Sequence, residues 1–134
     1  MGKREALIGR LDAIRAQVLA DLSDAADARL GDKPEGVPRA LRAQLLRLAE
    51  HQRQHVNQIE KTRWAIGARP SEVQLILGQA EEELGRMRAA LVGLSEEQLT
   101  QRPSADAWSI AEIVEHVANI EVRYADMAKR ILNA

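Results

Sequence analysis

Two histidines, His51 and His55, stand four residues apart in the run 45–59. On a helix, residues four apart lie one turn above each other on the same face, so two imidazoles at this spacing can bind one metal ion. The chain has one further histidine, His116, and no cysteine. A three-histidine metal site therefore has one possible composition here.

His55 falls on the apolar stripe of its predicted helix, which indicates that it faces the interior of a helical bundle, with His51 beside it. Gln44 and Gln58 lie seven residues either side of His51. Polar side chains in a buried face need partners, which a metal ion or a polar pocket would supply. The alternative is a polar interruption of a long helix, with His51 simply solvated. The stripe consists of Leu41, Leu45, Leu48, Gln52, His55, Ile59, Thr62 and Ile66.

Two carboxylates could support a site around His116. Glu112, one turn earlier, could orient the His116 ring as a hydrogen-bond acceptor, or it could be only the capping partner of Ser109. Glu121 interrupts an apolar helix face and could act as a general base or orient a water near a metal. It lies about 140° around the helix from His116, which favours an ordinary hydrogen bond inside the bundle.

Composition excludes several classes of protein. The chain has 134 residues, which predicts one domain, and a formal net charge of −1, which gives no basic patch for nucleic acid. No apolar run approaches the ~20 residues of a membrane span, and the N-terminal residues lack the apolar core of a signal peptide. We therefore expect a cytoplasmic protein that binds neither membrane nor nucleic acid; the absence of cysteine is typical of a reducing compartment.

Periodicity predicts four long helices and no strands, because no segment alternates with period two. The ranges are about 4–30, 38–66, 71–94 and 109–132, with a short helix from Ser95. Capping boxes are predicted at Ser71, Ser95 and Ser109, each with Gln or Glu three residues later. Trp108, just before the last box, is expected to be buried at the bundle end. This pattern favours an all-α four-helix bundle.

The segments 94–103 and 108–124, with Trp108-Ser-Ile followed by His116, resemble the first two helices of the DinB/YfiT-like superfamily. The pair His51 and His55, followed by Gln58-Ile59, is similar to the last helix of that family. The family's order is reversed here, because residues 1–67 resemble its second half and residues 71–134 its first. The chain is thus similar to a circularly permuted member, and we expect a single DinB-like domain over 1–134 built from these two helix pairs.

The resemblance implies a divalent metal, zinc or nickel, held by His51, His55 and His116. Two functions remain open. The protein could be a metal-dependent enzyme, a thiol S-transferase or a hydrolase, with a low-molecular-weight thiol or another small molecule as its partner. It could instead be a non-catalytic binding or stress-response module with a structural or vestigial site.

A homodimer in which the two chains exchange helix pairs is also expected. The resemblance implies an up-down-down-up bundle, in which the halves joined here by residues 67–71 end far apart. A helix over 71–93 is ~34 Å long, whereas a link of about four residues reaches ~14 Å at most. Each site would then take His51 and His55 from one chain and His116 from the other. The alternative is a monomer that folds back at Gly67 into an up-down-up-down bundle.

Overall fold

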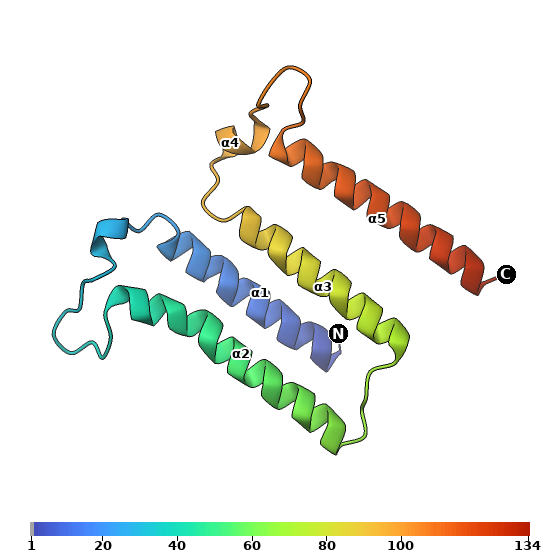
Figure 1. Cartoon of the computed structure of the whole chain (residues 1–134), viewed down its shortest axis with the longest axis horizontal. Coiled ribbons are helices and arrows are strands. Elements are labelled where there is room, and N and C mark those ends of the chain that lie inside the picture. The colour runs from blue at the N-terminus through green and yellow to red at the C-terminus, as the bar shows by residue number, and fades with distance from the viewer. Residues whose placement is uncertain (1) are drawn as a thin grey trace. The chain divides into compact units, whose positions relative to one another are not determined.

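The computed structural model describes residues 2–134, which are helical throughout apart from the connecting loops (Figure 1). The helices are α1 (Lys3–Leu22), α2 (Leu41–Ala65), α3 (Glu72–Ala90), α4 (Glu96–Thr100) and α5 (Ile110–Leu132), with a short 3₁₀ turn, η1, at Asp27–Arg29. No strand occurs in the described residues. The predicted all-α class is confirmed.

The chain divides into two units, each described here by itself. The N-terminal unit, residues 2–92, contains α1, α2 and α3, and the C-terminal unit, residues 93–134, contains α4 and α5. Gly93 lies at the boundary with a φ of 81°, a left-handed conformation that ends α3 at little cost for glycine. This boundary follows α3, and the division into helix pairs at residues 67–71 stays a prediction.

None of the helices in the described part of the chain is both long and apolar enough to cross a membrane.

All three predicted capping boxes are confirmed. The hydroxyl groups of Ser71, Ser95 and Ser109 accept hydrogen bonds from the backbone N–H three residues later, at 3.1 Å in each case. In return, the side chain of that later residue accepts a bond from the serine N–H. The boxes therefore set the starts of α3, α4 and α5 at the predicted residues.

The first helix is shorter than predicted, ending at Leu22 and not near residue 30. Asp21 and Asp24 lie at its C-terminal end and no basic residue lies in its last turn, so the local charges oppose the helix dipole. Asp27 lies instead in the first turn of η1, where a carboxylate is favourable. Acidic residues thus favour an end of α1 about two turns earlier than predicted.

The second helix starts three residues later than predicted, at Leu41. Its first N–H groups are bonded outside the helix, since Leu41 donates to the carbonyl of Asp32 at 3.0 Å and Arg42 to that of Leu30 at 2.8 Å. The loop after η1 thereby satisfies donors that would otherwise be unpaired at the helix start.

The apolar stripes of the N-terminal unit are not covered within that unit. Leu11 in α1, Ile59 in α2 and Leu77 in α3 are each 60% exposed. The contact that joins two of these helices is polar, an ion pair at 3.0 Å between Asp12 of α1 and Arg88 of α3. In the C-terminal unit, α4 packs against the start of α5.

Candidate metal centre

The two histidines of α2 lie together, as their spacing predicts. His51 and His55 approach edge to face, with ring centroids 4.4 Å apart and an interplanar angle of 75°. Their Nε2 atoms are 3.1 Å apart and share a hydrogen bond. Both rings are exposed on the described chain.

This separation fits a shared metal ion. Two imidazole nitrogens bound to one tetrahedral ion at about 2.0–2.1 Å lie about 3.3 Å apart. The observed 3.1 Å is close to that value, so the spacing of the two Nε2 atoms suits a shared ion. Neutral imidazoles suit zinc, nickel, iron and copper.

Gln58 holds the outer nitrogen of His55. The Gln58 Oε1 atom lies 2.7 Å from His55 Nδ1. A carbonyl oxygen can only accept, so Nδ1 carries the proton and the lone pair of neutral His55 is on Nε2. A bond of this kind on the outer nitrogen orients a histidine ligand and makes it more basic. Gln58 is one of the residues that the sequence pattern predicts to support the site.

Gln44 lies on the other side of His51, two turns earlier on α2. It lines a shallow hollow beside the His51 ring together with Arg39, Arg47, Leu48 and Gln52. Gln44 makes no direct bond to either histidine in the described structure, so its role as a pocket residue stays a prediction.

His116 lies on α5, in the C-terminal unit. Its ring packs against Trp108, with centroids 4.8 Å apart and planes tilted by 55°. Trp108 is 51% exposed, so its predicted burial is wrong for the chain as described. The Trp108 ring packs against the His116 ring and does not fill a buried core.

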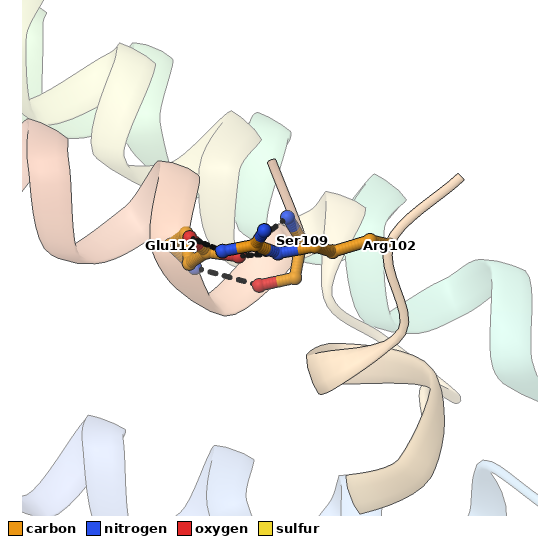
Figure 2. Close-up of polar contacts among 3 residues, drawn as sticks. All are labelled: Arg102, Ser109 and Glu112. Atoms are coloured by element: carbon orange, nitrogen blue, oxygen red, sulfur yellow. Dashed lines mark hydrogen bonds and ion pairs between the residues drawn. The ribbon is translucent and has the colours of Figure 1, made fainter. Parts of the chain in front are cut away.

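Glu112 caps α5, as the second of its two predicted interpretations states. Arg102 grips its carboxylate through two bonds, from Nε to Oε1 at 2.8 Å and from Nη2 to Oε2 at 2.7 Å, and the Ser109 N–H donates to Oε1 at 3.1 Å (Figure 2). The Arg102 guanidinium, with help from the Ser109 N–H, lowers the pKa of Glu112 to about 2. A role for Glu112 in orienting His116 is not seen in this arrangement.

This ion pair predicts an acid-dependent contribution to stability. Because the pKa of Glu112 falls from 4.5 to about 2 on folding, its stabilisation is present above about pH 4.5 and is lost as the pH falls through about 2. We expect Glu112→Gln, whose amide oxygen can still accept the bond from the Ser109 N–H, to be less stable than wild type near neutral pH. The difference in unfolding free energy should close towards about pH 2. Urea titrations across this range measure it, and a constant difference would contradict the assignment.

Glu121 lies on an exposed part of α5. Its proposed roles as a general base or as an internal hydrogen-bond partner both stay predictions.

The structure brings together His51, His55 and Gln58 in one unit, and Trp108 and His116 in the other. Among residues 2–134, neither unit holds within itself three His, Asp or Glu side chains placed to share a metal ion. Sequence reasoning missed Arg102 as the partner of Glu112, and the contact of Trp108 with His116. Neither pair has a diagnostic local motif, although Trp108 lies beside the motif that identifies the helix.

Comparisons with known proteins give a family. A family model described as the DinB superfamily matches residues 2–59 and 79–132, which include all three histidines. The uncharacterised protein YuaE of Bacillus subtilis strain 168 is 46% identical over 39 residues, or 29% of this chain. The chain matches 24% of YuaE, so it spans about a quarter of that curated relative. No solved structure matches.

Proposed function

Since this chain belongs to the DinB superfamily, we propose that it binds a divalent metal ion through His51, His55 and His116. The observation that carries the proposal is the arrangement on α2, where two Nε2 atoms lie 3.1 Å apart and Gln58 holds the outer nitrogen of one ring. Zinc and nickel are the expected metals, since both accept imidazole ligands.

The protonation states of the pair support this proposal. Gln58 leaves the lone pair of His55 on Nε2, and His51 Nε2 then donates its proton to that lone pair. Binding of both rings to one ion would require the proton of His51 to move from Nε2 to Nδ1, a change of tautomer that releases no proton. The lone pair on His55 Nε2 is already directed at the neighbouring donor.

The proposed activity is that of a metal-dependent thiol S-transferase or hydrolase. A divalent metal at such a site lowers the pKa of a bound water or thiol and so supplies a nucleophile near neutral pH. His51, His55 and His116 would hold the ion, Gln58 would orient His55, and Trp108 would fix the ring of His116. A low-molecular-weight thiol or another small molecule is the proposed partner.

The second candidate is a non-catalytic binding or stress-response module. The hydrogen bond between the Nε2 atoms of His51 and His55 favours this candidate. Each of these nitrogen atoms then has a hydrogen-bond partner without a metal ion. A metal that binds without accelerating thiol transfer or hydrolysis would support this function over the first.

The metal-binding proposal is tested through Gln58. We expect untagged protein to bind Zn²⁺, and Gln58→Leu to bind it about 10- to 100-fold more weakly, which is the usual effect of losing such a partner. Competition with a chromophoric chelator measures both affinities. Gln54→Leu, one turn away on the same helix, is the matched control and should bind as wild type does. Failure of the wild-type protein to bind Zn²⁺ or Ni²⁺ would overturn the proposal.

A further inference from the structure

The loop that joins α4 to α5 is closed by an ion pair at its base. Arg102 lies at the start of this loop, and Glu112 lies ten residues later, in the first turn of α5 (Figure 2). The Arg102 guanidinium donates to both carboxylate oxygens, at 2.8 and 2.7 Å. This paired geometry fixes direction as well as distance, which a lysine cannot reproduce. The ion pair therefore holds the two ends of the loop together.

The loop is also ordered between these ends. The Ala107 N–H donates to the Ser104 carbonyl at 3.2 Å and so forms a turn, and the ring of Pro103 restricts the backbone before it. Ser109, the N-cap of α5, is 3% exposed, where α4 packs against the start of α5. Trp108 lies between the turn and the cap, so its backbone is held on both sides.

Trp108 connects this loop to His116. The two rings pack against each other with centroids 4.8 Å apart, although eight residues separate them in the chain. The described structure shows no bond from Glu112 to the imidazole, so the loop reaches His116 through the indole. A histidine on an exposed helix face can otherwise adopt several rotamers. Packing against the indole restricts the His116 ring.

The order of this segment is a property of the C-terminal unit alone. All of these contacts join residues of the segment 102–116, so they do not depend on how the other helices pack. The Arg102 guanidinium, with the Ser109 N–H, lowers the pKa of Glu112 to about 2. The carboxylate is therefore charged at neutral pH, and the ion pair is present at the pH at which a metal would bind.

We propose that Arg102 is a positioning residue of the metal site. Its ion pair with Glu112 closes the loop, the closed loop holds Trp108, and Trp108 holds the His116 ring in one orientation before a metal binds. A ligand that is already oriented loses less conformational freedom on binding, so the site binds metal more tightly. This inference rests on the proposed function, because it concerns His116 as a metal ligand, but the order that it describes is present without metal.

Proton NMR of the metal-free protein tests the effect of Arg102 on the ring. The chain has three histidines, so few imidazole C–H signals need to be assigned. The ring current of an indole 4.8 Å away shifts those of His116. We expect Arg102→Gln to move these signals towards their positions in Trp108→Leu, which has no indole there. Arg102→Lys keeps the charge without the paired bonds and should give an intermediate shift.

Competition with a chromophoric chelator tests the effect of Arg102 on metal binding. Arg102→Gln should bind Zn²⁺ about 2- to 10-fold more weakly than wild type, the effect of one side chain that must be ordered on binding. Glu112→Gln, which can still cap Ser109, should lose a similar factor. The matched control is Arg86→Gln, which breaks an exposed ion pair with Glu83 in α3 and should change neither measurement.

The outcomes separate this inference from the proposed function. His116 signals that are the same in Arg102→Gln and in wild type would overturn the inference, and so would shifted signals with unchanged Zn²⁺ affinity; neither result affects the proposed function. Wild-type protein that binds neither Zn²⁺ nor Ni²⁺ would overturn the function, and Arg102 would then position a ring that is no ligand. If circular dichroism shows that Arg102→Gln is unfolded, Arg102→Lys and Glu112→Gln decide both points.

Discussion

Replacing His55 with alanine is expected to abolish stoichiometric metal binding, from about one Zn²⁺ per chain to none. His55 supplies one of three proposed ligands, and its Nε2 lies 3.1 Å from that of His51. The two remaining histidines, His51 on α2 and His116 on α5, would bind far more weakly, because the ion would have to fill its other positions with water. Inductively coupled plasma mass spectrometry after dialysis against free zinc measures the loss.

The matched control for His55→Ala is Gln54→Ala. It removes a polar side chain of similar size at the neighbouring position of α2, and should retain the wild-type metal content. Equal metal content in His55→Ala and in wild type would show that the ion binds elsewhere. Far-ultraviolet circular dichroism of both variants checks that α2 is still folded.

The second large effect is expected from Leu11→Asp. Leu11 is 60% exposed on the described chain and lies in the apolar stripe of α1, which the homodimer predicted from the sequence would cover. A carboxylate buried there without a partner costs several kcal/mol, enough to dissociate a dimer at micromolar concentration. The mass measured by light scattering should fall from twice 14.9 kDa to 14.9 kDa.

Ala16→Asp is the control for charge alone. Ala16 lies about 140° around α1 from Leu11, on the side away from the stripe. This variant should keep the dimeric mass. A Leu11→Asp protein that is as dimeric as Ala16→Asp would remove α1 from the interface.

Local signals predicted much of the secondary structure. Each capping box, at Ser71, Ser95 and Ser109, is a motif of four consecutive residues, and all three motifs start a helix. The end of α1 was predicted wrongly, because the apolar period continues to Ala25 while Asp21 and Asp24 oppose the helix dipole. Helix ends depend on such weak, competing terms.

The site was predictable where it depends on helical spacing. The approach of His51 and His55 and the bond from His55 to Gln58 follow from positions four and three apart. The grip of Arg102 on Glu112 spans ten residues and a loop, so no periodicity indicates it. The packing of Trp108 on His116 was missed because an aromatic residue before a cap was expected to fill a core.

The proposed joining of His116 to the pair on α2 depends on how separate segments pack, which is a property of tertiary and quaternary structure. The family match covers both segments and leaves out residues 60–78, the span that contains the predicted junction of the two halves. A permuted order of the family's halves would place a link there, and the permutation stays part of the proposal.

The most direct test of the three-histidine site is X-ray absorption spectroscopy of the untagged wild-type protein loaded with one equivalent of Zn²⁺. The proposal predicts three imidazole ligands with Zn–N distances of about 2.0–2.1 Å, and an exchangeable oxygen or thiol ligand in the fourth position. The His116→Ala protein should lose one imidazole from this count. A wild-type spectrum with two imidazoles or fewer, unchanged by His116→Ala, would contradict the proposed site.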